Sequence, residues 1–393
     1  MAGLYIHIPF CASRCIYCGF YSTTSLKLRQ RYVDAVCREM ILRGEKFLPP
    51  KGRSVARNEV RSERIDTIYF GGGTPSQLTI PQIRQLFTYI NKVYKLPSLM
   101  GGAGGGFEVT IEMNPDDATP AWTEILPQLG VNRVSMGAQT FNDERLRFLH
   151  RRHTARQVPE AVKILRNAGI RNISIDLMYG FPGETLDDWQ RDIDAVLALN
   201  VEHISAYCLM VEEGTILYKR LKMKDEKLKM PDEELERLMY EVLIDKLTAA
   251  GYEHYEISNF AKPGYRSRHN SSYWQDIPYI GLGAAAHSYD LKYRSYNVAD
   301  IQQYIEAIEH GELPSEQEVI DEDTHYNDRI TVALRTSDGL DLTTISDRHR
   351  RYCMKEAQRF LDDGLLQLSD NRLSLTRKGL FVSDYVMSSL IMV

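Results

Sequence analysis

The sequence predicts an α/β fold: a parallel sheet curled into an incomplete, three-quarter TIM-like barrel, followed by a smaller, mostly helical domain. Two observations support this prediction. Over the first 250 residues, six apolar, β-branched runs alternate with longer segments of helical period, which is typical of repeated strand–helix units. After residue 297 the alternation stops and helical segments dominate. A complete barrel needs eight such units, so we expect an open one.

The six strand–helix units are expected in order along the chain. The strands are predicted at residues 4–10, 67–70, 108–113, 133–137, 172–178 and 203–209, and the helices at residues 26–47, 81–94, 121–129, 156–168, 186–199 and 232–250. Residues 49–64, rich in charge, and residues 96–106, rich in glycine, interrupt the pattern. The glycine run is not followed by the Lys-Ser/Thr pair of a phosphate-binding loop, so both stretches are interpreted as surface insertions.

The chain is predicted to divide into three parts. Residues 1–250 form the partial barrel, residues 251–296 form a motif-bearing segment, and residues 297–393 form the C-terminal domain. Near residues 360–376 a helix leads into a small β-hairpin, which gives this domain a winged-helix-like arrangement. Its basic side chains are offset by nearby acidic ones, so a lid or docking role is favoured over nucleic-acid binding.

The composition is that of an ordinary globular protein. Of 393 residues, 43% are hydrophobic and 26% are charged, and the net charge is −5. This balance gives no general attraction to nucleic acid or to an anionic membrane, and no apolar run is long enough to span a bilayer. No basic leader precedes the cysteines that begin at Cys11, so we expect a cytoplasmic protein whose other thiols, Cys37, Cys208 and Cys353, are reduced.

Three cysteines, Cys11, Cys15 and Cys18, follow the first predicted strand at C-x3-C-x2-C spacing. Disulfides would leave one thiol over. Zinc would need a fourth ligand close by, and neither Phe20 nor Tyr21 supplies one. Three thiolates suit a cubane [4Fe–4S] cluster and would leave one of its irons open for chemistry.

Further polar residues and a glycine turn fall where the other predicted strands end. In a parallel barrel, the C-terminal strand ends converge on one rim, where binding sites are built. A carboxylate at such a rim can hold an amine or ribose hydroxyls, an arginine can hold a carboxylate, and glycines let a ligand approach the backbone. The candidates are Gly72, Gly73, Thr74, Glu112, Gln139, Arg151 and Asp176.

Residues 255–288 mix aromatic side chains, small residues and the two histidines His269 and His287. This mixture suits a flat apolar ligand that carries a metal, because rings stack on aromatic side chains and imidazole ligates iron. The alternative, that each histidine is a packed core residue, stays open.

Together these motifs resemble the branch of the radical S-adenosylmethionine (SAM) superfamily that includes oxygen-independent coproporphyrinogen III oxidase and the HemW-type heme chaperones. The resemblance covers about residues 4–290 and is carried by residues 5–11 (YIHIPFC), 71–75 (GGGTP), Gln139, and Asp176 with residues 179–182 (YGFP). It implies that Cys11, Cys15 and Cys18 bind a [4Fe–4S] cluster, whose open iron chelates SAM. The SAM contacts that it implies are Tyr5, Tyr17, Gly72, Gly73, Thr74, Glu112, Gln139, Arg151 and Asp176.

One departure separates the two branches. Phe20 stands where the oxidase has a fourth cysteine, while residues 255–261 (YEISNFA) and the HNxxYW motif at 269–274 resemble the chaperones. The resemblance therefore implies heme binding through His269, Tyr273 and Trp274, delivery of heme to an acceptor protein, and an electron donor for the cluster. No catalytic residue is assigned. Two other classes stay open: oxidative decarboxylation of coproporphyrinogen III, and a radical enzyme that modifies nucleic acid through the C-terminal domain.

Overall fold

The computed structural model describes residues 2–47, 65–94, 96, 107–223 and 228–392. The two predicted insertions, residues 49–64 and 96–106, lie outside the described residues apart from Leu96. Within the described part, no helix is long and apolar enough to cross a membrane.

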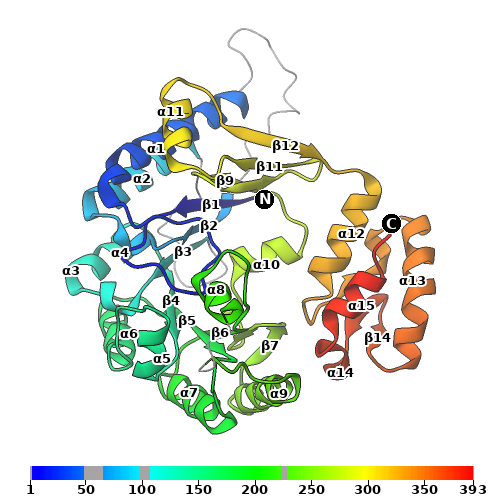
Figure 1. The fold of residues 1–393 in the computed structure, drawn as a ribbon. Coiled ribbons are helices and arrows are strands. Elements are labelled where there is room, and N and C mark those ends of the chain that lie inside the picture. Colours follow the sequence, from blue (N-terminus) through cyan, green and yellow to red (C-terminus); the bar gives the residue numbers. More distant parts are fainter. Residues whose placement is uncertain (1, 48–64, 95, 97–106, 224–227, 393) are drawn as a thin grey trace, which may run out of the picture.

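Six parallel strands form the centre of the molecule (Figure 1). They are β1 (Ala2–Ile8), β2 (Ile65–Gly72), β3 (Glu108–Met113), β4 (Arg133–Gln139), β5 (Asn172–Tyr179) and β6 (His203–Cys208), paired in this order. Each matches a predicted strand to within two residues at either end. The strands are buried along almost their whole length, and their apolar, often β-branched residues alternate with buried polar ones such as Thr67, Thr110 and Ser174.

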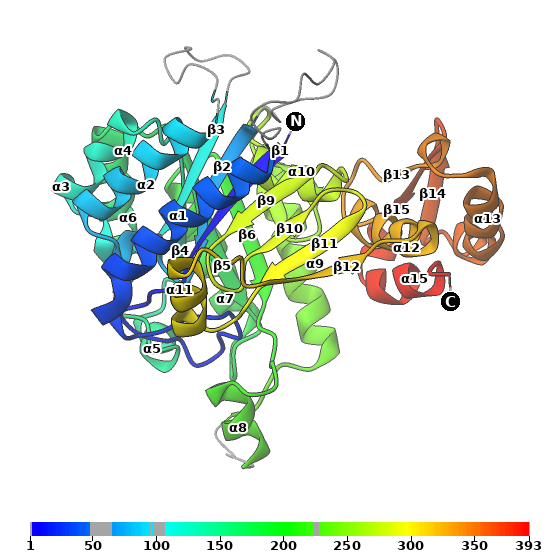
Figure 2. The same ribbon diagram turned by 90° about the horizontal axis from the view of Figure 1, so that it is seen from above.

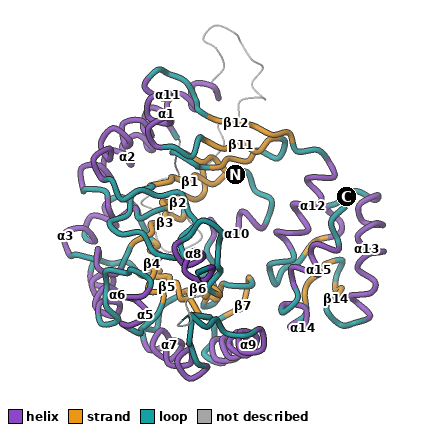
Figure 3. The backbone as a smooth tube through the Cα atoms, viewed as in Figure 1, coloured by secondary structure: helices purple, strands orange, loops and turns teal. Residues whose placement is uncertain are grey.

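Helices cover the outer face of this curved sheet, as Figure 3 shows most simply. They are α1 (Arg29–Phe47), α2 (Ile80–Val93), α3 (Pro120–Thr123), α4 (Ile125–Gln128), α5 (Asp143–Phe148), α6 (Gln157–Asn167), α7 (Leu186–Ala198) and α9 (Glu233–Ala249). Helix α8 (Ile216–Lys222) projects beyond the C-terminal ends of the strands (Figure 2), where Leu217 packs with Ile16 of the cysteine loop. The predicted helix at 121–129 is in fact the two short helices α3 and α4. The main hydrophobic core lies between the sheet and these helices.

The sheet continues past both sides of the parallel strands. Beside β1 it adds β9 (Tyr279–Leu282), β10 (His287–Tyr289), β11 (Tyr293–Asn297) and β12 (Ser315–Val319), and beside β6 it adds β8 (Asn259–Ala261) and β7 (Glu253–Glu256). The barrel stays open, so the predicted fold class is confirmed. The division of the chain at residues 250 and 296 stays a prediction, although the sheet itself runs on through β12.

A buried carboxylate ties this added part of the sheet to α1. Glu39 accepts hydrogen bonds from the Gly283 amide at 2.8 Å, the Asn297 side chain at 2.9 Å and the Tyr304 hydroxyl at 2.6 Å. It also pairs with Arg43 at 2.8 Å, one turn along the same helix. Tyr304 belongs to α11 (Ile301–Glu309), so one carboxylate joins three segments that are distant in sequence.

The C-terminal domain lies beside the barrel with a core of its own (Figure 2). It contains α12 (Glu322–Ala333), β13 (Leu340–Asp341), α13 (Asp347–Asp362), β14 (Leu366–Ser369), β15 (Arg372–Leu375), α14 (Arg377–Leu380) and α15 (Ser383–Ser389). Helix α13 leads directly into the β14–β15 hairpin, so the predicted helix-then-hairpin arrangement is present. A short helix, α10 (Arg268–Trp274), lies between this domain and the barrel.

Candidate functional site

A cavity of about 420 Å³ opens at the C-terminal ends of the parallel strands; we call it the rim cavity. Its lining includes Cys11, Cys15 and Cys18 and eight of the nine predicted SAM contacts: Tyr17, Gly72, Gly73, Thr74, Glu112, Gln139, Arg151 and Asp176. The ninth, Tyr5, does not line the cavity, and its hydroxyl lies 3.0 Å from His7 Nδ1. The structure thus brings segments from five different strand ends to one place.

The cysteine loop is fixed to the barrel by backbone hydrogen bonds. The Cys11 amide donates to Thr23 O at 2.9 Å, and the Ile16 amide donates to Leu149 O at 3.3 Å. The three free thiols of this loop are half-buried. Burial raises the pKa of the Cys11 and Cys18 thiols, so their ionised form needs a metal partner.

The donor set fits a [4Fe–4S] cluster. Among the described residues, no three His, Cys, Asp or Glu side chains lie close enough together to hold a single metal ion. A cubane asks for a different arrangement, because each thiolate binds a separate iron. Thr74 Oγ1 lies 3.7 Å from Cys11 Sγ, and Arg151 Nη1 lies 3.7 Å from Cys15 Sγ. These donors are the kind of group that stabilises the negative charge of cluster sulfurs.

The glycine turn after β2 holds the cysteine loop in place. Gly72 has a φ of 107°, and a Cβ at this residue would lie 2.5 Å from the His7 ring. A Cβ at Gly73 would lie 2.8 Å from the Pro9 carbonyl carbon. Only glycine lets the two loops approach so closely, and this close contact explains why the turn is rich in glycine.

Two carboxylates form the floor of the rim cavity. Glu112 accepts a hydrogen bond from the Tyr69 hydroxyl at 2.7 Å, and burial together with the charge of Asp176 raises the pKa of Glu112 to about 7. Asp176 accepts from Ser135 Oγ at 3.2 Å, and burial also raises the pKa of Asp176. A cationic ligand or a ligand rich in N–H and O–H donors would suit both carboxylates.

Arg151 is the cation nearest to the cysteines. Its Nη2 donates to Asn114 Oδ1 at 2.7 Å and to the Gly137 carbonyl, while its Nε is buried without a hydrogen-bond partner among the described residues. Gln139 lies at a bulge in β4 with a φ of 67°, which breaks the regular alternation of side chains at the end of the strand. Together they leave donors that are available to a carboxylate.

Sequence reasoning missed three groups near this site. Asn114, which positions Arg151, directly follows the predicted strand 108–113 and could have been found there. Arg133 is almost fully buried, and its Nε and Nη1 lack partners among the described residues. The mouth of the cavity carries Phe20, 72% exposed, and Met210, 70% exposed. Neither Arg133 nor Met210 carries a motif, so no local signal pointed to them.

The structure places the predicted heme contacts elsewhere. His269 is fully buried, with Nδ1 2.9 Å from Thr67 Oγ1 and Nε2 2.8 Å from the Tyr273 hydroxyl. Both ring nitrogens are therefore occupied, so the imidazole does not offer a heme iron a free nitrogen in this conformation. Trp274, at the end of α10, instead lines a second cavity between the barrel and the C-terminal domain.

Comparison with known proteins agrees with this geometry. A model of the radical SAM superfamily matches residues 5–196, and a model of the HemN C-terminal domain matches residues 320–382. The chain superimposes on coproporphyrinogen III oxidase (HemN) from Escherichia coli, a radical SAM enzyme, with a TM-score of 0.81. That likeness covers 100% of this chain and 90% of the other at 22% identity, so it concerns the fold alone.

Sequence relatives extend over almost the whole chain. The heme chaperone HemW of Bacillus subtilis is 35% identical, with 98% of both chains covered. The heme chaperone HemW of Lactococcus lactis is 31% identical, with 97% of this chain and 95% of the relative covered. With this identity over nearly the full length, the chain belongs to the HemW family of radical SAM proteins.

Proposed function

We propose that this protein binds a [4Fe–4S] cluster and SAM in the rim cavity and carries heme to an acceptor protein. The observation that carries the proposal is the full-length similarity to proteins named heme chaperone HemW. A second observation favours the same reading: Phe20, at the place of the fourth cysteine of the oxidase branch, is exposed and offers no ligand.

In this proposal each residue of the rim cavity has a physical task. Cys11, Cys15 and Cys18 hold three irons of the cluster, which supplies one-electron chemistry at its open iron. The unpartnered Nε–H of Arg151 suits the carboxylate of SAM, because hydrogen bonds between a guanidinium and a carboxylate are charge-assisted. Glu112 and Asp176 suit the amino group and the ribose hydroxyls, which are donors.

The finer parts of the proposal concern its partners and place. Heme delivery requires an acceptor protein, and use of the cluster requires an electron donor. Reduced thiols and an oxygen-sensitive cluster are suited to the cytoplasm. The three predicted heme contacts divide between two environments, because His269 and Tyr273 bond to each other whereas Trp274 lines a cavity.

The deciding experiment compares heme binding with enzymatic turnover of coproporphyrinogen III. The anaerobically reconstituted protein is given hemin in one assay, followed by its Soret absorbance. In a second assay the protein is given coproporphyrinogen III, SAM and a chemical reductant. We expect stoichiometric heme binding and no protoporphyrinogen IX. Repeated turnover of coproporphyrinogen III would replace the chaperone function by the oxidase function, and failure to bind heme would end the proposal.

A further inference from the structure

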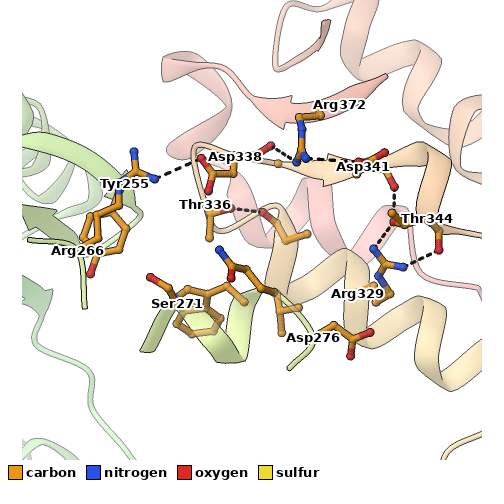
Figure 4. Close-up of a pocket in the computed structure, with 15 residues that line it drawn as sticks. Tyr255, Arg266, Ser271, Asp276, Arg329, Thr336, Asp338, Asp341, Thr344 and Arg372 are labelled. Atoms are coloured by element: carbon orange, nitrogen blue, oxygen red, sulfur yellow. Dashed lines mark hydrogen bonds and ion pairs between the residues drawn. The ribbon is translucent and has the colours of Figure 1, made fainter. Parts of the chain in front are cut away.

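A second cavity, of about 480 Å³, separates the barrel from the C-terminal domain; we call it the interdomain cleft (Figure 4). Strand β7, the loop before α10 and α10 itself line one side through Tyr255, Arg266 and Trp274, respectively. The C-terminal domain lines the other side through Arg329, from α12, and Arg372, from β15. Its volume falls in the range of about 300–1,000 Å³ that is usual for small-molecule sites, which often lie between domains.

The arginines of the cleft are not all neutralised by carboxylates. Arg266 pairs with Glu253 at 3.0 Å and with Asp338 at 3.3 Å, and Arg372 pairs only loosely with Asp341, at 3.4 Å. Arg329 donates to the carbonyl and hydroxyl oxygens of Thr344 and has no carboxylate within 4 Å among the described residues, so it shares with Arg372 the more distant charge of Asp341, whose pKa is lowered by local hydrogen bonds and by both arginines. Figure 4 shows Arg329 and Arg372 on neighbouring parts of the same wall.

The third lining acid is also engaged. Asp276, which follows α10, pairs with His325 at 2.7 Å and accepts a hydrogen bond from the Tyr289 hydroxyl. It therefore leaves Arg329 and Arg372 with the capacity to bind an added carboxylate, the anion that guanidinium groups match best.

The opposite side of the cleft is aromatic. Trp274 lines it, and Arg335 Cζ lies 5.5 Å from the centroid of the indole ring. The indole Nε1 is buried and has no hydrogen-bond partner among the described residues.

We infer that the interdomain cleft binds the propionate-bearing edge of a porphyrin, with Arg329 and Arg372 on the carboxylates and Trp274 beside the ring. The inference rests on the proposed function and specifies where its ligand lies. The rim cavity is lined by the groups assigned to the cluster and SAM, so heme needs another place. The cleft combines the two features that a porphyrin presents, a flat apolar ring and two carboxylates.

The cleft holds the porphyrin without ligating its metal. No described residue that lines it is a His, Cys or Met, and the Tyr255 hydroxyl is already bound to His203 at 2.8 Å. A carrier of this kind leaves the heme iron free for the ligands of an acceptor protein. It follows that metal-free protoporphyrin IX binds about as tightly as hemin.

The test measures binding of hemin, protoporphyrin IX and protoporphyrin IX dimethyl ester to the full-length protein. Arg329→Gln and Arg372→Gln are each expected to weaken binding of both free acids about tenfold, because each removes a charged hydrogen bond. The parent is expected to bind the ester at least tenfold more weakly than the acid. In the double variant this preference for the acid should disappear.

Arg350→Gln and Arg351→Gln are the matched controls. Both arginines lie on exposed positions of α13 in the same domain and do not line the cleft, so the same loss of charge should leave binding unchanged. Thermal melts followed by circular dichroism verify folding, and Arg329→Lys should restore part of the affinity. If a variant fails to fold, the comparison of acid and ester on the parent still decides.

The other possible results distinguish failure of this inference from failure of the proposed function. Hemin binding without protoporphyrin binding would overturn the inference in favour of iron ligation elsewhere, and the proposed function would stand. Arginine variants that bind both acids like the parent, or an ester bound as tightly as the acid, would also overturn it. A parent that binds no porphyrin at all would sink the proposed function itself.

Discussion

His269 and Tyr273, one turn apart on α10, are bonded to each other, with 2.8 Å between Nε2 and the phenolic oxygen. Thr67 Oγ1, on β2, occupies the other ring nitrogen. Burial and the charge of Arg133 lower the pKa of His269 to about 3, so the imidazole is neutral at physiological pH. This side chain anchors α10 to the barrel, a role that the motif letters alone do not reveal.

Replacing His269 by Leu should therefore destabilise the fold. The change leaves Thr67 and Tyr273 without their buried partner, and each lost partner costs about 1–3 kcal/mol, so the free energy of unfolding should fall by about 2–6 kcal/mol. Guanidinium unfolding followed by circular dichroism measures this. Tyr273→Phe, which removes one of the two bonds, should cost less. If the His269→Leu variant is as stable as the parent but no longer binds heme, as followed by the Soret absorbance, His269 is an axial ligand of the heme iron.

Loss of any one cluster cysteine should remove the iron. After anaerobic reconstitution we expect about four irons per chain in the parent, and little iron in the Ala variants of Cys11, Cys15 or Cys18. Cys37→Ala is the control, because this thiol is buried in α1, away from the cavity. Iron and sulfide analysis gives the readout. A Cys15 variant with full iron content would contradict the assignment.

SAM affinity should fall as the pH drops below about 7. The pKa of Glu112 is raised to about 7, mainly by burial, so this carboxylate is protonated at lower pH and loses its attraction for the amino group and ribose hydroxyls of SAM. Between pH 8 and pH 6 the dissociation constant should rise about tenfold. Equilibrium dialysis at both pH values measures it. Glu112→Gln should bind SAM more weakly at pH 8 and show no such slope; a parallel slope in the variant would move the titration to another group.

Removing the buried carboxylate of Glu39, which links α1 to α11, should lower the free energy of unfolding more than removing the exposed carboxylate of Glu309, which links the same two helices. Glu39→Ala leaves Arg43, Asn297 and Tyr304 without their acceptor, and breaking such a buried cluster costs about 3–5 kcal/mol. Glu309 pairs with Arg31 across α11 and α1, but both side chains are about half exposed. Glu309→Ala should therefore leave denaturant unfolding nearly unchanged. Equal losses in the two variants would show that Glu39 is not the link.

The six parallel strands and the rim of the site could be predicted from the sequence for the same reason. Apolar β-branched residues at alternate positions mark such a strand, and residues 172–178 place Ile173, Ile175 and Leu177 between the polar residues Asn172, Ser174 and Asp176. Polar residues near the C-terminal ends of such strands then converge on one edge. Glu112 and Asp176 were found in this way and lie on one cavity.

The rest of the molecule gave weaker signals. Strand β10 has three residues, and every side chain of β12 is exposed, so neither needs an apolar pattern. The environment of His269 depends on Thr67, which is 202 positions earlier in the chain. Local sequence cannot show which group forms a hydrogen bond with a ring nitrogen when that group lies so far away along the chain. The interdomain cleft likewise depends on how two separate cores are placed beside each other.

The outer edge of β12 affects whether molecules of this protein aggregate at high concentration. This strand ends the order of the sheet, and the backbone groups of such an edge are open to strands from other molecules, the usual route to fibres. Glu316 and Glu318 both lie on β12, and an antiparallel copy would bring these like charges together. These two glutamates therefore keep the β12 edge of the open barrel from acting as a template for aggregation.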